Sequence, residues 1–287
     1  MNYIDKQFEA FADVLGVLEA IGLGFLLLII AETLWDFSIK KRVSLKETTA
    51  NFIIAIANHL LDRTLFGLVF ILGLFIAQTY AFFTISTAWW SWIMAILMAD
   101  FTYYWMHRCE HQVRVLWSYH SVHHSSPEFN LTTGLRLAWV EGMVEWLFFV
   151  PMILIGFSAI QTFIALSIVV LYQTWIHTEK IGKLGWVDRV FNTPSVHRVH
   201  HGSNKPYHDK NYGGILIIWD RLFGTYKSEQ EKVVYGITTP ISSWNPLVIN
   251  FYEFWKIIKD ILKTKKLSDA VGFLFYRPGW KPKDRGD

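Results

Sequence analysis

Long apolar segments alternate with short charged ones along the first 176 residues of this chain. Segment 14–35 is long enough to cross a hydrocarbon core of about 30 Å as a helix. The acids inside it, Glu19 and Glu32, are expected near helix ends or against protein. The other segments of this kind are 64–84, 88–106, 139–157 and 158–176. The pattern predicts an all-α integral membrane protein with about four to five transmembrane helices.

Positive charge then orients the predicted helices. Lys and Arg favour the cytoplasmic side of a membrane. They gather in segments 40–46, 107–136 and 180–189, whereas the turns near 86 and 157 are uncharged. A multi-pass path with all three basic segments on the cytoplasmic side satisfies every loop. The expected location is a bacterial inner membrane, or the endoplasmic reticulum in a eukaryote.

Eight of the 11 histidines lie in three windows of five residues. The windows read H-R-C-E-H at 107–111, H-S-V-H-H at 120–124 and H-R-V-H-H at 197–201. Residues three and four apart share a helix face, so each window directs its imidazoles one way. Thr193 and Pro194 are expected to open the third helix, and Ser125-Ser126-Pro127 to end the second. The charge pattern places all three windows on the cytoplasmic side.

A metal site explains these windows better than separate core histidines, because burying many imidazoles without partners is costly. Histidine binds zinc, copper, iron and nickel. Eight imidazoles exceed one tetrahedral zinc and suit two metals with about four each. The predicted ligands are His107, His111, His120, His123, His124, His197, His200 and His201. His177 is either a ninth ligand or a hydrogen-bonding residue beside the site, and His59 and His208 are left out.

Polar residues near the windows are candidates to support the metal ligands, because a ligating histidine usually donates its other N–H to an oxygen. Asp100 is favoured, since it lies in an apolar segment, seven residues before His107 on the same face. The other candidates are Glu110, Glu179, Asn192, Asp209 and Asn211. Of this set, Asp100, Glu179 and Asn192 are the predicted catalytic residues.

Composition agrees with membrane embedding. The chain is 52% hydrophobic and 18% charged, against roughly 25% charged in soluble domains. The net charge of +3 is too small to indicate a nucleic-acid partner, and the single Cys109 excludes intramolecular disulfides. We expect one domain over 1–287. It would combine the spans with a histidine-rich cytoplasmic cap at 107–136 and 177–226, and with a tail at 227–287 on the membrane surface.

The three windows match the eight-histidine signature of the fatty acid hydroxylase and sterol desaturase superfamily. W-I-H-T-E at 175–179, N-T-P-S-V-H-R-V-H-H-G at 192–202 and D-K-N-Y-G-G-I-L-I-I-W-D-R-L-F-G-T at 209–225 resemble its alkylglycerol monooxygenase branch and the bacterial relatives of that branch. The resemblance implies an integral membrane enzyme with two iron ions, held by the eight window histidines, that uses O2 and two electrons. It implies a membrane lipid as substrate, an ether lipid in that branch. The electron donor would be tetrahydrobiopterin, with a ferredoxin or cytochrome as the alternative.

Other readings of the same histidines remain open. A desaturase or another lipid hydroxylase of the superfamily would use the same residues. A zinc hydrolase would favour H-E-x-x-H, whereas Glu110 stands next to His111. A haem carrier would place histidines in mid-span, whereas these cluster at helix ends. An unactivated C–H bond requires a metal–oxygen oxidant, which favours the oxygenase. The lipid, the electron donor and the oligomeric state are not determined by the sequence.

Overall fold

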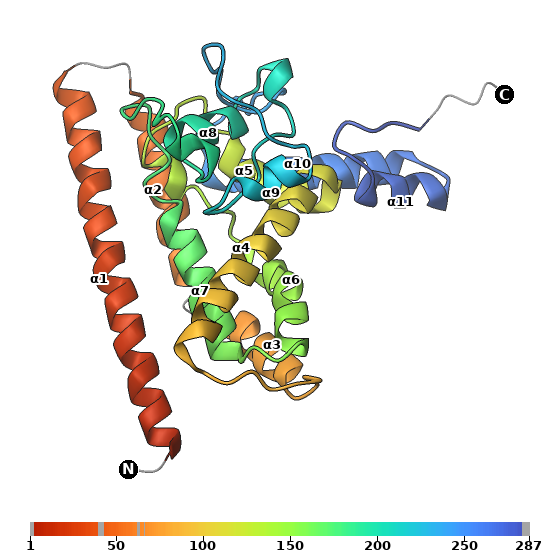
Figure 1. The fold of residues 1–287 in the computed structure, drawn as a ribbon. Helices are drawn as coiled ribbons and strands as arrows, with labels where there is room; N and C mark the ends of the chain where they lie inside the picture. Colours follow the sequence, from red (N-terminus) through yellow and green to blue (C-terminus); the bar gives the residue numbers. More distant parts are fainter. Residues whose placement is uncertain (1–2, 40–42, 62–63, 66, 283–287) are drawn as a thin grey trace.

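The computed structural model describes residues 3–39, 43–61, 64–65 and 67–282, and it is mostly helical (Figure 1). The first helices are α1 (Tyr3–Ser38), α2 (Leu45–Leu61), α3 (Gly67–Gln78) and α4 (Trp89–Gln112). The others are α5 (Arg114–His124), α6 (Gly142–Leu154), α7 (Ala159–Tyr172), α8 (Pro194–His200), α9 (Ile218–Leu222), α10 (Pro246–Lys263) and α11 (Leu267–Phe275). The helical fold class is confirmed.

Helices α3, α4, α6 and α7 form a bundle around an apolar core. Leu74, Phe149 and Val169 are buried in it, and Ala95 lets the other helices approach α4 closely. A second core, with Ile54 of α2 among its buried residues, lies between α2, α5 and α10. Helix α4 thus extends from the bundle into the upper part of the molecule, where the second core packs α5 beside the end of α4 (Figure 1).

Three predicted spans are helical over only part of their length. Helices α3, α6 and α7 contain 12, 13 and 14 residues. Each is therefore about 18 to 21 Å long, shorter than a hydrocarbon core. The chain turns back early because the N–H of Phe82 donates to the carbonyl of Leu154 at 2.8 Å, and that of Ile85 to Gly156 at 2.9 Å. Gly156 turns the chain with a φ of +112°.

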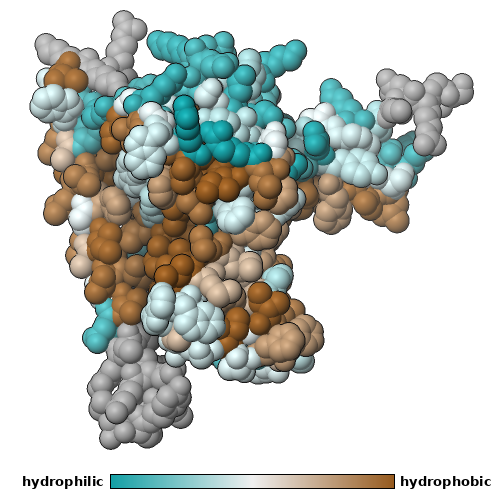
Figure 2. Space-filling view, viewed as in Figure 1, coloured by the Kyte–Doolittle hydropathy of each residue, from teal (hydrophilic) through white to brown (hydrophobic). Residues whose placement is uncertain are grey.

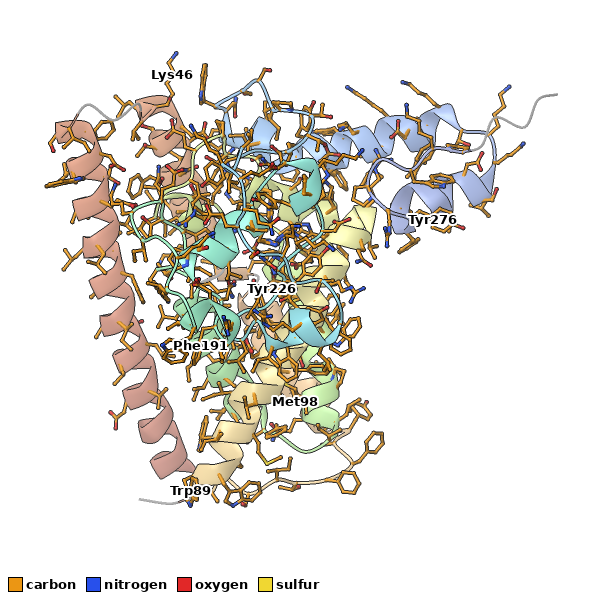
Figure 3. All side chains as sticks on the ribbon, turned by 45° about the horizontal axis from the view of Figure 1, so that its top comes forward. Lys46, Trp89, Met98, Phe191, Tyr226 and Tyr276 are labelled. Atoms are coloured by element: carbon orange, nitrogen blue, oxygen red, sulfur yellow. The ribbon has the colours of Figure 1, made fainter. Side chains whose placement is uncertain are left out.

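Among the described residues, α1 is the one helix both long and apolar enough to cross a membrane, from Gly16 to Ser38. The number of crossings therefore stays a prediction. Figure 2 shows a brown, apolar lower part and a teal, polar upper part. Large side chains such as Leu27, Phe82 and Trp89 are 68–76% exposed. Trp89 and Lys46 lie at opposite ends of the molecule (Figure 3). An apolar surface of this extent favours a lipid environment.

The end of α1 is attached to the polar upper part. As expected, Glu32 faces protein: it accepts hydrogen bonds from the N–H of Leu131 at 2.6 Å and from the hydroxyl of Thr178 at 2.5 Å. Asp36, one turn later, pairs with Lys180. Thr178 follows His177 directly, so α1 is connected to the histidine-bearing part of the chain.

Candidate metal centre

Nine histidines gather in two adjacent groups. The five-histidine group is His107, His111, His120, His124 and His200, and the four-histidine group is His123, His177, His197 and His201. Within each group, one ring nitrogen of every member lies within 4.8 Å of those of the others. The groups touch, since the rings of His124 and His201 stack with centroids 4.3 Å apart. His177 therefore lies among the window histidines.

The helices explain how the first two windows meet. Helix α4 continues past the apolar segment, so His107 and His111 lie one turn apart on one face. At Val113 the backbone becomes extended, with φ −113° and ψ 117°, and α5 begins directly afterwards. This break turns α5 back against α4, which brings its histidines to the same face.

Helices α5 and α8 each serve both groups. On α5, His120 and His124 join the five-histidine group, whereas His123 joins the other. Across the centre, His197 and His201 join the four-histidine group and His200 the other. In both helices the residues four apart join one group and the residue three positions after the first joins the other, so the way α5 and α8 face each other sets the division.

Helix α8 begins at Pro194, as predicted. The Thr193 side chain does not cap the helix, and its hydroxyl donates instead to Asp188 at 2.5 Å. Proline supports the start by itself, because its fixed φ suits the first helical position. Helix α8 then ends at His200, and His201 is its C-cap residue.

Backbone carbonyls fix the proton position in three imidazoles. Nδ1 of His107 lies 2.9 Å from the carbonyl of Tyr212, and Nδ1 of His200 lies 2.9 Å from that of Lys210. Nδ1 of His177 lies 2.8 Å from the carbonyl of Gln173. A carbonyl only accepts, so each Nδ1 carries the proton and each Nε2 presents a lone pair. Ligating histidines in metalloproteins are held in this way.

The five-histidine group has the spacing of metal ligands. Nε2 of His120 lies 3.0 Å from Nε2 of His107 and 3.2 Å from that of His124. Nε2 of both His111 and His200 is buried without a hydrogen-bond partner among the described residues. Two nitrogens bound to one metal at about 2.1 Å lie about 3.0 to 3.4 Å apart. These donors and distances fit a metal ion.

The four-histidine group is similar. Nε2 of His177 lies 2.9 Å from Nε2 of His197 and 3.1 Å from that of His123. Nε2 of His197 is 3.1 Å from that of His201. Burial lowers the pKa of His177 to about 4, and it lowers the pKa of the six histidines at 120–124 and 197–201 well below the usual value. These imidazoles are therefore neutral, which is the form that binds metals.

Asp100 supports the histidines indirectly, through a backbone segment that lies between them. Its carboxylate accepts hydrogen bonds from the N–H of Ile215 at 2.5 Å, the N–H of Leu216 at 3.1 Å and the indole of Trp219 at 2.8 Å. It therefore holds the segment 209–216, which in turn supplies the carbonyls to His107 and His200. Asp100 and His107 share a helix face, but the Asp100 carboxylate does not bond His107 directly. Its oxygens accept hydrogen bonds from the backbone of Ile215 and Leu216 instead.

Asn192 and Asp220 hold the same segment. The amide of Asn192 donates to the carbonyl of Gly213 at 2.6 Å. Asp220 accepts from the N–H of Tyr212 and from that of Gly213, both at 2.8 Å. Asp220 is fully buried, and burial raises the pKa of its carboxyl. Asp220 is not among the residues predicted from the sequence, because it lies outside the three histidine windows, and only its place in segment 209–225 could have indicated a role.

The remaining candidates differ in their distance from the rings. Oε2 of Glu110 lies 3.2 Å from Nδ1 of His120, and its Oε1 accepts from Tyr119. Glu179 is exposed and accepts from the hydroxyl of Tyr235 at 3.2 Å. The residues in positive-φ conformations, Asp209 and Asn211, shape the segment 209–216. The excluded histidines, His59 and His208, are both exposed.

Two kinds of cavity reach the histidines. An apolar cavity of about 520 Å³ extends from Leu26 of α1 and Ile56 of α2 to His120, His123 and His177. A neighbouring cavity of about 800 Å³ shares Leu137, Glu141, Glu145, Val170 and Thr174 with it and is bordered by α1, α3 and α7. A third, polar cavity of about 300 Å³ reaches the rings of His111, His124, His200 and His201. The centre thus has an apolar and a polar approach.

A helical scaffold with a histidine-rich candidate metal centre defines the class of this protein. Residues 92–225 match the family model "Fatty acid hydroxylase", and they contain every histidine of both groups. The predicted membership is confirmed: this part of the chain is a domain of the fatty acid hydroxylase family.

Individual relatives are enzymes of lipid chemistry by name. Human alkylglycerol monooxygenase is 43% identical over 193 residues, which cover 67% of this chain and 43% of that protein. An ornithine lipid hydroxylase from Rhizobium tropici is 29% identical over 136 residues, covering 47% of this chain and 41% of that protein. A Delta(7)-sterol 5(6)-desaturase from Gibberella zeae is 25% identical over 178 residues, covering 59% and 53%. The chain spans about half of these relatives or less. No solved structure matches it.

Proposed function

We propose that this protein is a membrane di-iron oxygenase that hydroxylates a C–H bond of a lipid. One observation carries the proposal: the lone pairs of His107 and His200, fixed by backbone carbonyls, converge with the unpartnered Nε2 of His111 beside a second histidine group. We assign all nine histidines as ligands, five to one iron and four to the other. Likeness to alkylglycerol monooxygenase favours an ether lipid as substrate.

The overall reaction takes one O2, two electrons and two protons, places one oxygen atom in a C–H bond and releases the other as water. The two iron ions, when bound, supply the oxidant that a C–H bond without acidity requires. The chain's own contribution is rigidity. The segment 209–216 keeps the protons of His107 and His200 on Nδ1, and Asp100, Asn192 and Asp220 keep that segment in place.

The apolar cavity is the proposed route of the lipid. Its exposed surface is mainly apolar, although Glu110, Glu141 and Glu145 belong to the lining. It ends at His120, His123 and His177, so a hydrocarbon chain can reach both groups through it. Because the adjoining cavity borders α1, α3 and α7, the chain would enter sideways from the bilayer. We assign the polar cavity to the polar reactants. The electron donor is tetrahydrobiopterin or a ferredoxin or cytochrome.

We further propose a multi-pass location with the candidate centre on the cytoplasmic side. Helix α1 crosses the membrane, and the exposed apolar surface of the bundle lies in lipid. The basic segments 40–46, 107–136 and 180–189 support this orientation, because positive loops remain in the cytoplasm. A zinc hydrolase is disfavoured because Glu110, its nearest candidate base, is already engaged with His120 and Tyr119.

The test combines metal analysis with product analysis. Protein purified with iron should contain about two irons per chain, with a Mössbauer spectrum of a coupled pair. With a bacterial lipid extract, an electron donor and ¹⁸O2, mass spectrometry should find one labelled oxygen in a lipid product. Separate arms would compare tetrahydrobiopterin with a ferredoxin system, and alkylglycerols with other lipids. An alkene product without label would instead make the protein a desaturase.

Two variants sharpen this test. His123→Ala should lose iron and product, whereas His208→Ala should keep its iron, because His208 is exposed and bonded to the carbonyl of Ser203. One haem per chain, or no O2 consumption with any lipid and donor, would refute the oxygenase.

A further inference from the structure

Helix α10 has an apolar face that no other part of the described chain covers. Its Ile249, Glu253 and Ile257 are buried against the second core and its surroundings. The exposed apolar side chains form a stripe along the helix, beside this buried face. They are Leu247, Val248, Phe254, Trp255 and Leu262.

Helix α11 repeats the arrangement. Leu267, Val271 and Phe275 follow one another at intervals of four residues and are 81%, 45% and 57% exposed. Phe273, by contrast, is buried. Figures 1 and 2 show α10 and α11 projecting sideways as an arm, with a brown side facing the same way as the apolar lower part and a teal side facing away. Figure 3 places Tyr276 on this arm.

The charges of the arm are mainly basic at the margin of this face. Counted from Leu247, Lys259 and Lys263 lie about 120° and 160° around the helix axis of α10, just beyond Val248 at about 100°, which ends the apolar stripe. Lys265 and Lys266 stand in the link to α11 and are exposed. An apolar face with tryptophan and a lysine margin is typical of a helix that lies in the membrane interface.

We propose that the α10–α11 arm (residues 246–276) lies in the interface of the bilayer, with its apolar face among the upper acyl chains and its lysines on anionic phospholipid head groups. This inference goes beyond the proposed function, since it concerns neither metal nor substrate. It specifies the level at which the bilayer surface meets the molecule: at the arm, between the apolar bundle and the polar upper part.

The arm is joined to the helix that bears the second histidine window. The Arg114 guanidinium at the start of α5 pairs with Asp260 of α10 at 2.5 Å and lies over the ring of Phe273. The N–H of Arg114 donates to the carbonyl of Tyr276 at 3.1 Å. Lys256 of the arm also lines the polar cavity. A bilayer that holds the arm therefore holds α5 and one wall of this cavity.

The test uses fluorescent labels on the full chain in lipid nanodiscs. In a Cys109→Ser background, an environment-sensitive dye is attached at Leu262→Cys or at its neighbour Lys263→Cys, and at Leu267→Cys or its neighbour Ser268→Cys. All four positions are exposed, and the members of each pair point about 100° apart. Lipids with a nitroxide near the head group should quench the dyes at 262 and 267 about threefold more than those at 263 and 268. Adding phosphatidylglycerol to phosphatidylcholine discs should widen this difference.

Equal quenching within both pairs would overturn the proposal. Protection of the dyes at 262 and 267 from both lipid-borne and water-soluble quenchers would also overturn it, because a protein, either a partner or a second copy, would then cover the face. A pattern indifferent to phosphatidylglycerol would overturn the assignment to anionic head groups. None of these outcomes affects the oxygenase proposal, whose test measures iron and product.

Discussion

Asp220 and His107 are linked through a single residue, Tyr212. The carboxylate of Asp220 accepts from the N–H of Tyr212 at 2.8 Å, and the carbonyl of Tyr212 lies 2.9 Å from Nδ1 of His107. A buried carboxylate thus determines which nitrogen of a candidate ligand faces the five-histidine group. Asp100 secures the same segment three residues further on, at Ile215.

Replacing Asp220 with asparagine should weaken metal binding in the five-histidine group. The amide would present a donor to the N–H of Tyr212 or of Gly213, where the carboxylate offers two acceptors. Loss of such a supporting partner costs about 10- to 100-fold in metal affinity. Iron content measured against a graded chelator should show the loss for Asp220→Asn. Asp209→Asn in the same segment is the control, because asparagine tolerates the left-handed backbone at that position.

Gly214 is expected to be irreplaceable. A Cβ at this position would lie 2.6 Å from Cγ1 of Val169 and 2.8 Å from Oδ1 of Asp100. Gly214→Ala should therefore push the segment 209–216 off Asp100 and lower both iron content and thermal stability, the latter by about 1 to 3 kcal/mol. Gly224→Ala tests a different constraint, since a Cβ there meets nothing within 4 Å but φ is +72°. It should cost stability and leave the iron content unchanged. Equal iron content in Gly214→Ala and the unmodified protein would contradict the expectation.

His177→Ala should weaken metal binding in the four-histidine group. Its Nε2 lies within 3.1 Å of the Nε2 atoms of both His123 and His197, so its removal takes away a donor that stands between two others. We expect a fall in metal affinity of about 10-fold or more. The measurement is iron per chain after gel filtration, together with the Mössbauer signal of the pair. A full iron complement in this variant would limit His177 to lining the centre.

Filling the apolar cavity should hinder the lipid and spare the metal. Ala55 of α2 lines this cavity, whereas Ile53 on the same helix is exposed and lies outside it. Ala55→Trp should lower turnover of long-chain lipids about 10-fold or more, because a bulky ring takes up space that a chain of CH2 groups needs. Iron content should not change. Ile53→Trp is the matched control, and an equal loss of turnover in both variants would refute the proposed route.

Glu32 should matter for stability although it lies in the apolar α1. It accepts hydrogen bonds from Leu131 and Thr178, so Glu32→Ala leaves two donors unpaired. The expected cost is about 1 to 3 kcal/mol, seen as a lower melting temperature in detergent. Asp13→Asn, an exposed position of the same helix, should have no measurable effect.

Periodicity predicted the local parts of this structure well. The spacing in each window and the start of α8 at Pro194 depend on neighbours within a few residues. Hydropathy was less informative about length. Segment 64–84 is apolar throughout, yet α3 ends at Gln78, because the pairing of Phe82 with Leu154 is a contact between distant parts of the chain.

The backbone contacts through which Asp100 and Asn192 hold segment 209–216 were the part that sequence could not predict. Asp100 and Ile215 are 115 positions apart, and Asp220 acts through backbone N–H groups that every residue except proline has. Such contacts leave no periodic trace. The division of the windows between two groups was hidden for a similar reason, since it depends on how α5 and α8 face each other.

Because α5 and α8 each contribute to both histidine groups, the two groups cannot be ordered separately. An ion in one group would fix the helices that the other also needs, and so would remove part of the entropy cost of filling the second. Loading should then be positively cooperative. At substoichiometric iron, a population of chains would consist mainly of fully loaded and empty molecules, with few that hold a single ion.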